Sequence, residues 1–252
     1  MEPILVTGGS GTLGRRLVDR LVADGRTVRV LSRRPRPAQT ATVIEWITGD
    51  LLTGAGLDTA LADGAVVVHC ATNPVRPRQD IEATGRLIEA ARQAATPHLL
   101  HVSIVGIDLV PLPYYRAKLR VERLIEESGL PWTIQRATQF HELVLAAAHK
   151  LTRGPVGIAP AVITQPVAAD EVAERLAALT QQGPAGRVPD LGGPASGTLA
   201  EFIRATLDAE GRRRPLLPLR IPGRTGRALH QGHLTTREPN TGRLTFREFL
   251  TP

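Results

Sequence analysis

Tyr114 and Lys118 stand four residues apart at the start of a predicted helix, in the stretch PYYRAKLRVERLI. Residues at positions i and i+4 share one face of a helix, so the phenol and the ammonium are expected to be neighbours. An ammonium group lowers the pKa of a nearby phenol because it favours the ionised form. Such a phenol acts as a general acid toward a carbonyl or as a base toward an alcohol. The pair therefore predicts a site of proton transfer.

A serine upstream completes the candidate catalytic set of Ser103, Tyr114 and Lys118. Ser103 ends the predicted strand Leu99–Ser103, at the carboxyl edge of a sheet, where doubly wound folds bind ligands. We expect its hydroxyl to hydrogen-bond a substrate carbonyl and to orient Tyr114. The alternative is a strand-end hydroxyl that caps a turn. Tyr115 is the alternative phenol if the helix begins differently.

A glycine-rich loop follows the first apolar run, in ILVTGGSGTLGRRL. Two registers fit it, one with Gly9, Gly11 and Gly14 and one with Gly8, Gly11 and Gly14. Glycines let the backbone approach a pyrophosphate, and the next helix offers its N–H groups and positive dipole end to the phosphates. The loop therefore predicts nucleotide binding. Its candidate contacts are Thr7, Gly8, Ser10, Gly11, Thr12, Leu13 and Gly14.

The end of the second predicted strand bears on which nucleotide binds. A carboxylate there would accept the ribose 2′-hydroxyl of NAD and repel a 2′-phosphate. The sequence VRVLSRRP instead supplies Ser32, Arg33 and Arg34. An arginine presents a planar fork that suits a phosphate, and a serine adds a donor. These residues predict that the cofactor is NADP(H).

Apolar strands alternate with helical patterns along the first half of the chain. Alternation of this kind implies right-handed crossovers and a parallel sheet covered on both faces. We therefore predict an α/β fold, a Rossmann-type doubly wound parallel sheet. The expected strands are Glu2–Thr7, Thr27–Leu31, Val43–Ile47, Val66–His69, Leu99–Ser103 and Trp132–Arg136. The expected helices are Thr12–Ala23, a short one around Gly56–Ala62, Ile81–Ala95 and Tyr114–Ser128.

The pattern loosens after about residue 150, where Pro and Gly become frequent. Helices are expected at Asp170–Thr180 and Thr198–Ala209, and the tail from PLLPLRIPG to TFREFL is expected to be irregular and partly extended. We predict a Rossmann core over residues 1–150. Residues 151–252 are predicted to form a small substrate-side lobe that completes the same domain.

Composition narrows the possible partners. The net charge of +7 comes from arginines scattered along the chain, and only 3% of residues are aromatic, so neither a basic recognition face nor stacking platforms for nucleic acid are expected. One cysteine excludes an internal disulfide, and no apolar run is long enough to span a bilayer. We expect a cytoplasmic protein with a small-molecule substrate and no nucleic-acid or membrane partner; the sequence leaves the oligomeric state open.

Histidines are the remaining candidates for chemistry. His69 lies in an apolar strand and is expected to be a packed core residue. His98 and His101 are three apart along a strand, which places them on different faces, so no metal site is expected. Nothing in sequence near Cys70 indicates a reactive thiolate.

Together these motifs resemble the short-chain dehydrogenase/reductase superfamily, in its atypical branch near the NmrA-like NAD(P)H-binding proteins. The motif T-G-x-x-G-x-x-G appears as Thr7, Gly8, Gly11 and Gly14, which favours the second glycine register. The resemblance implies an adenine contact at Asp50 with Leu51, and a cofactor-lining segment at Ala71 and Thr72. It matches Ser103, Tyr114 and Lys118 to the family's catalytic triad. It implies that Thr138, Gln139 and Phe140 face the substrate. His141, beside them after the sixth predicted strand, is a further pocket candidate, and the start of a helix is the alternative.

The chain departs from the family at two points. An R-P dipeptide is usual after the sixth strand, and Arg136-Ala137 stands there; Ser103 and Tyr114 are also slightly closer than usual. The resemblance implies an NADPH-dependent oxidoreductase that reduces a small organic carbonyl or related unsaturated substrate, with tyrosine as proton donor. Two alternatives stay open: a non-catalytic NADP(H) sensor, since many NmrA-like members have lost the triad, and a redox-neutral isomerase, epimerase or cyclase.

Overall fold

The structure, a computed structural model, describes residues 2–37, 43–238 and 242–251. The chain forms two compact units that alternate along the sequence. The first unit comprises Met1–Ser103, Arg116–Gln135 and Val172–Val188, and the second comprises Ile104–Tyr115, Arg136–Glu171 and Pro189–Pro252. The predicted organisation, with a core over 1–150 and a lobe over 151–252 within one domain, stays a prediction.

A seven-stranded sheet runs through the first unit, with strand order β3-β2-β1-β4-β5-β6-β9. The strands β1, β2 and β4 pair in parallel, and Ile4 lies beside Val28 on one side and beside Val66 on the other. This order reverses direction between β1 and β4, which is the switch point where doubly wound folds bind ligands. The strands are β1 (Ile4–Thr7), β2 (Val28–Ser32), β3 (Ile44–Thr48), β4 (Val66–His69), β5 (Leu99–Ile104), β6 (Trp132–Ala137) and β9 (Gly186–Arg187).

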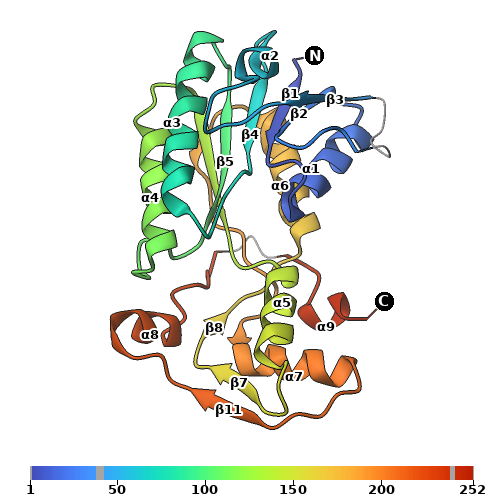
Figure 1. The fold of residues 1–252 in the computed structure, drawn as a ribbon, viewed down its shortest axis with the longest axis vertical. Coiled ribbons are helices and arrows are strands. Elements are labelled where there is room, and N and C mark those ends of the chain that lie inside the picture. Colours follow the sequence, from blue (N-terminus) through green and yellow to red (C-terminus); the bar gives the residue numbers. More distant parts are fainter. Residues whose placement is uncertain (1, 38–42, 239–241, 252) are drawn as a thin grey trace. The chain divides into compact units, whose positions relative to one another are not determined.

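Helices cover both faces of this sheet (Figure 1). Helices α3 and α4 lie on one face and α1 and α6 on the other, while α2 connects β3 to β4. Leu5, Val67 and Leu99 from the central strands pack with Leu87 of α3 and Ile125 of α4 in one hydrophobic core. The helices are α1 (Thr12–Ala23), α2 (Leu57–Leu61), α3 (Pro77–Gln93), α4 (Pro113–Glu126) and α6 (Ala169–Gln182).

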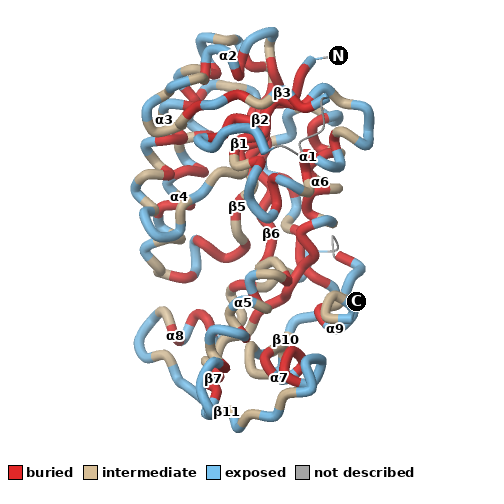
Figure 2. Tube along the Cα trace, turned by 45° about the vertical axis from the view of Figure 1, so that its right-hand side comes forward, coloured by how far each residue is buried: buried red, intermediate tan, exposed pale blue. Residues whose placement is uncertain are grey.

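The predicted fold class is confirmed. All six expected strands and the four expected helices of the first half occur, with bounds that differ by a few residues at most. Continuous apolar runs such as VVVH form strands that are buried along their whole length, and these strands form the red centre of the first unit in Figure 2. A strand covered on both faces has no polar side, which is why its sequence does not alternate.

Among its described residues, the second unit contains short paired strands and the four helices α5, α7, α8 and α9. Strands β8 (Ile163–Thr164) and β10 (Gly197–Thr198) pair antiparallel, and β7 (Gly157–Pro160) and β11 (Leu216–Leu219) pair parallel. Helices α5 (His141–Leu151) and α7 (Leu199–Ala209) pack together through Ala148, Ile203 and Leu207. The remaining helices are α8 (Gly223–His230) and α9 (Phe246–Phe249).

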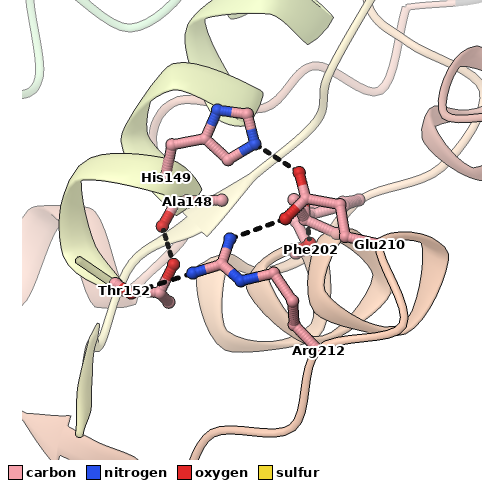
Figure 3. Close-up of polar contacts among 7 residues, drawn as sticks. Ala148, His149, Thr152, Phe202, Glu210 and Arg212 are labelled. Carbon is pink, nitrogen blue, oxygen red and sulfur yellow. Dashed lines mark hydrogen bonds and ion pairs between the residues drawn. The ribbon is translucent and has the colours of Figure 1, made fainter. Parts of the chain in front are cut away.

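A polar cluster joins the ends of α5 and α7 (Figure 3). The Glu210 carboxylate accepts from His149 Nε2 at 2.5 Å and from Arg212 at 2.6 Å. The same guanidinium donates to the main-chain oxygen of Thr152 at 3.1 Å. These hydrogen bonds hold the chain after α7 against the last turn of α5.

The second unit contains more regular structure than its sequence pattern predicts. Residues 141–151 form α5, which confirms the alternative of a helix start at His141. The tail is more regular than expected because it contains β11, α8 and α9. The glycines and prolines of this region mark the starts of elements here: Gly223 begins α8 directly after Pro222. Within the described ranges, no helix is long and apolar enough to cross a membrane.

Candidate functional site

The glycine loop folds in the register of Gly8, Gly11 and Gly14. Gly8 has φ +72°, a left-handed conformation that favours glycine. A Cβ on Gly8 would lie 2.7 Å from the main-chain nitrogen of Ala71, and one on Gly14 would collide with the Gly8 carbonyl oxygen. Gly11 N donates to that same oxygen at 2.9 Å and closes the turn. Gly9 is needed for packing, since its Cβ would lie 2.8 Å from Val30.

Helix α1 begins directly after this turn with its first N–H groups uncapped by a side chain. Gly11 is the N-cap residue and makes no side-chain cap. The first N–H groups of a helix have no partner within the helix, so they are available to an anion. A Cβ on Gly11 would meet only the Gly8 oxygen within 4 Å, which leaves the approach to this end of the helix open.

The segment after β4 lies against the glycine loop and is braced by a buried carboxylate. Asp80, in the first turn of α3, accepts from Thr72 Oγ1 at 2.6 Å and from the Asn73 main-chain N–H at 2.8 Å. Ala71 is the residue that approaches Gly8. The loops after β1 and β4, both predicted to contact the cofactor, are therefore adjacent.

The predicted 2′-phosphate contacts lie at the end of β2. Ser32 is buried and its hydroxyl accepts from the Arg34 main-chain N–H at 3.1 Å. Arg33 and Arg34 are exposed, and no ion pair involving them is found within the described ranges. Asp50 follows β3 and accepts from the Leu52 N–H at 2.9 Å, with Leu51 half-buried beside it.

Lys118 carries its ammonium group into the interior of the first unit. Its side chain is 4% exposed, and Nζ lies 3.2 Å from His101 Nε2 and 3.3 Å from the Val102 carbonyl oxygen. Burial lowers the pKa of Lys118, while Asp80, Glu122 and Cys70 act in the opposite direction. Lys118 is therefore held by β5 from one side and surrounded by carboxylates from α3 and α4.

Ser103 lies one residue beyond the Val102 carbonyl that accepts from Lys118. Its side chain is 3% exposed, and its Oγ has no hydrogen-bond partner among the described residues. A buried hydroxyl without a partner is uncommon because its desolvation is uncompensated. The alternative reading, a hydroxyl that caps a turn, has no contact to support it.

The two tyrosines differ in their surroundings within the second unit. Tyr115 packs against the cluster of Val110, Leu229 and Leu234, and burial raises the pKa of its phenol to about 12. Tyr114 is half-buried at the first turn of α4 and its ring lies 5.9 Å from that of Tyr115. The packing of Tyr115 favours Tyr114 as the phenol available for chemistry.

The predicted substrate-facing residues 138–141 lie in the second unit, and their side chains are largely engaged there. Thr138 donates to the Gln165 main-chain oxygen at 2.5 Å, and Gln139 Oε1 accepts from Thr164 at 2.5 Å. His141 is fully buried, its Nε2 bonds the Leu244 carbonyl at 3.0 Å and its ring lies against Phe246. This placement favours a packing role for His141. Phe140 is half-buried and caps α5.

The prediction that His69 is a packed core residue is confirmed. Its Nδ1 lies 2.7 Å from Thr7 Oγ1 and its Nε2 lies 3.2 Å from Thr84 Oγ1. Burial lowers the pKa of His69 to about 3 and raises the pKa of the neighbouring Cys70 to about 12, so both groups are neutral. No cluster of metal-ligating side chains occurs among the residues that the structure describes.

Sequence reasoning missed two residues. Asp80 was not considered, and His101 was weighed only as a metal ligand. His101 stands two residues before Ser103 on the same strand, and positions i and i+2 share a face of a strand. That spacing was a signal that could have placed His101 beside the candidate site.

The first unit by itself contains features that suit the binding of a dinucleotide. It combines a glycine cradle that a Cβ would fill, an uncapped helix N-terminus and a buried lysine at one edge of the sheet. The remaining candidates, Tyr114 and residues 138–141, belong to the second unit.

Comparison with known proteins identifies the relatives of this chain. A family model described as NAD(P)H-binding matches residues 8–182. The (4-alkanoyl-5-oxo-2,5-dihydrofuran-3-yl)methyl phosphate reductase of Streptomyces griseus is 32% identical over 206 residues, which cover 79% of this chain and 70% of that protein. The 4-hydroxy-2-methyl-3-oxo-4-farnesyl-3,4-dihydroquinoline-1-oxide ketoreductase of Stigmatella aurantiaca is 28% identical, covering 82% of this chain and 72% of that protein.

A solved structure shares the fold over nearly the whole chain. The NADPH-dependent quinone oxidoreductase QOR2 of Escherichia coli, in complex with NADPH, superimposes with a TM-score of 0.84 over 98% of each chain, at 20% identity.

The glycine loop predicts that substitutions at two glycines with nearly the same φ, Gly8 and Gly25, have different effects on nucleotide binding. Gly8 has φ +72° and a crowded Cβ position, whereas Gly25 has φ +71° with nothing within 4 Å. Gly25→Ala should cost only the left-handed strain, about 1 kcal/mol, and leave nucleotide affinity unchanged. Gly8→Ala should add a clash with Ala71 and weaken NAD(P)H binding about tenfold or more, measured by fluorescence titration. Equal affinities of the two variants would overturn the cradle assignment.

The buried histidines predict acid-sensitive stability. Burial lowers the pKa of His69 to about 3 and that of His101 well below 6.5, so below pH 6.5 the unfolded chain binds protons that the folded chain does not. Stability is then complete above pH 6.5 and falls as the pH falls, by about 1.4 kcal/mol per pH unit for each histidine. Urea unfolding at pH 7 and pH 5 measures this slope.

Two variants check the source of the slope. His101→Gln should remove the contribution of His101 and leave that of His69, while replacement of the exposed His230 by Gln should leave the slope unchanged. Equal stability of the unaltered protein at the two pH values would contradict the neutral buried state of both histidines.

Proposed function

The chain belongs to the NAD(P)H-binding family, and from this premise we propose that it is an atypical short-chain dehydrogenase/reductase that uses NADPH to reduce a small organic carbonyl or related unsaturated substrate. One observation carries the proposal most directly. The first unit buries Lys118, which donates to the Val102 carbonyl of β5, and the buried hydroxyl of the next residue, Ser103, lacks a hydrogen-bond partner among the described residues. A buried ammonium and a buried hydroxyl suit an oxygen that gains negative charge during a reaction.

Each candidate residue has one role in the proposed reaction. Ser103 donates a hydrogen bond to the substrate carbonyl oxygen and polarises it. Tyr114 gives its phenolic proton to that oxygen, and the positive charge of Lys118 stabilises the phenolate that remains. The reduced nicotinamide, when bound, supplies the hydride that adds to the carbonyl carbon, so the products are the alcohol and NADP⁺.

The cofactor would be held by the groups already described in the first unit. The N–H groups at the start of α1 would meet the pyrophosphate, and Lys118 would hold the nicotinamide ribose. Asp50 would meet the adenine, and Arg33 and Arg34 the 2′-phosphate. The relatives support a reductase, since one is named a ketoreductase and the other is named for a substrate whose ring double bond is conjugated with a carbonyl.

The proposed roles predict that substitutions of the two adjacent tyrosines have different effects on kcat. Tyr114→Phe should lower kcat for NADPH-dependent reduction about 100-fold or more, because the proton donor is lost. Tyr115→Phe is the matched control and should leave kcat unchanged, since its phenol packs in a cluster of aliphatic side chains. The measurement is NADPH consumption over a panel of ketones, quinones and unsaturated lactones.

Three outcomes separate this proposal from its alternatives. Unchanged turnover in Tyr114→Phe would remove tyrosine from the reaction. Tight NADPH binding with no turnover across the panel would favour a sensor. Conversion of a substrate without net NADPH consumption would favour an isomerase, epimerase or cyclase.

The 2′-phosphate assignment predicts a change in cofactor preference. Combined Arg33→Ala and Arg34→Ala substitutions should weaken NADPH binding about tenfold to 100-fold, the loss expected for hydrogen bonds to a charged group, and leave NADH binding unchanged. Arg123→Ala removes an exposed positive charge from the last turn of α4, at the opposite edge of the sheet, and controls for net charge. Comparable affinity of the unaltered protein for NADPH and NADH would contradict the assignment.

A further inference from the structure

A row of polar side chains crosses the three central strands of the sheet. Thr7 of β1 is paired in register with His69 of β4, and His69 is paired with His101 of β5. Residues paired in register point to the same face of a parallel sheet. All three are at most 2% exposed, and the two imidazole rings stack with their centroids 5.2 Å apart. The row ends at Lys118, which contacts His101.

The hydrogen bonds fix which nitrogen of His69 carries the proton. The Thr84 hydroxyl donates to the Asp80 main-chain oxygen at 2.7 Å, so it accepts from His69 Nε2. His69 Nδ1 then carries no proton and accepts from the Thr7 hydroxyl. Both nitrogens of the neutral His69 ring have hydrogen-bond partners. The main-chain oxygen of His69 remains available as an acceptor.

The same reasoning fixes His101. Its Nδ1 lies 3.1 Å from the His69 main-chain oxygen, and a carbonyl oxygen only accepts, so Nδ1 carries the proton. A neutral imidazole with a proton on Nδ1 presents a lone pair on Nε2. That lone pair faces Lys118 Nζ at 3.2 Å.

We propose that His101 is a positioning residue whose Nε2 lone pair anchors the Lys118 ammonium and sets its direction. An ammonium group has three hydrogens. One is committed to His101 and one to the Val102 carbonyl, so a single hydrogen remains for a hydroxyl of the nicotinamide ribose. This inference rests on the proposed role of Lys118 in holding the cofactor.

A neutral acceptor has an advantage over a carboxylate at this position. A carboxylate hydrogen-bonded to Lys118 would cancel its positive field, and a phenolate on Tyr114 would lose that stabilisation. The imidazole holds the ammonium without adding charge. The charged and titratable groups that act on Lys118 are Asp80 from α3, Glu122 from α4 and Cys70 after β4. Of these, Asp80 is bonded to the loop at Thr72 and Asn73.

Substitution of His101 by Gln or by Asn tests the roles of its two ring nitrogens one at a time. The amide of Gln reaches the position of Nε2, so His101→Gln keeps an acceptor for Lys118. The amide of Asn reaches only the position of Nδ1, so His101→Asn keeps the bond to the His69 oxygen and loses the acceptor. His98→Asn is the matched control, because His98 is equally buried just before β5 and bonds Thr133 at 2.8 Å, away from Lys118.

The composition of the chain allows Lys118 to be observed directly. The chain has only two lysines, Lys118 and the exposed Lys150. Acylation by an amine reagent, followed by mass spectrometry over a range of pH, gives the labelling curve of each. A change in accessibility scales the rate at every pH, whereas a change in the pKa of Lys118 moves the inflection of its curve. Lys150 serves as the internal standard.

We expect His101→Asn to move the Lys118 inflection about one pH unit lower, which is about tenfold faster labelling below it, because an acceptor that favours the charged form is lost. NADPH affinity should fall by a similar factor. His101→Gln should restore both values, and His98→Asn should change neither. Thermal unfolding of each variant checks that it is folded.

An unchanged Lys118 curve in folded His101→Asn, or the same shift in His98→Asn, would overturn the proposal. The labelling test needs no turnover, so it is separate from the test of the reductase. If the protein reduces no carbonyl but the Lys118 curve moves as expected, the proposed function fails and the anchoring of Lys118 stands.

Discussion

A buried ammonium group is the constraint around which the first unit is arranged. Lys118 is 4% exposed, and a charge removed from water is tolerated only when its hydrogen bonds and charge are compensated. The acceptors come from β5, at His101 and the Val102 carbonyl, and the negative charges from α3 and α4. Strand and helices must therefore keep one relative placement for the lysine to remain charged, so the packing of the first unit is tied to this one group.

The same constraint reaches the nucleotide loop through a short series of contacts. Asp80 offsets the charge of Lys118 and holds the loop at Thr72, and the neighbouring Ala71 lies where a Cβ on Gly8 would be. The glycine loop and the lysine are thus both linked to Asp80, the loop through the segment after β4 and the lysine through its charge. Loss of the Asp80 carboxylate would leave the Asn73 N–H without its acceptor and Lys118 without a compensating charge.

Prediction from sequence succeeded where one local signal was enough. The continuous apolar run VVVH is sufficient to indicate a strand buried on both faces, and Gly8 and Gly14 are required by a turn that spans only a few residues. It failed where several weak signals had to be combined. Residues 141–151 are a helix that packs against α7, and the tail holds short elements such as α9, whose four residues pack against distant parts of the chain.

The sequence by itself determined the doubly wound sheet, the glycine loop after the first strand and the presence of a tyrosine and a lysine one helical turn apart, because periodicity and short spacings carry that information. Only the tertiary structure decided the state of the groups around them. Tyr115 packs in a cluster that includes Leu229 and Leu234, more than a hundred positions away, and Asp80 accepts a hydrogen bond from Thr72. Burial keeps His101 neutral, and its hydrogen bond to the His69 main-chain oxygen fixes the proton on Nδ1. Tautomer, burial and charge depend on which distant atoms become neighbours, and that is decided when the strands pair and the helices pack.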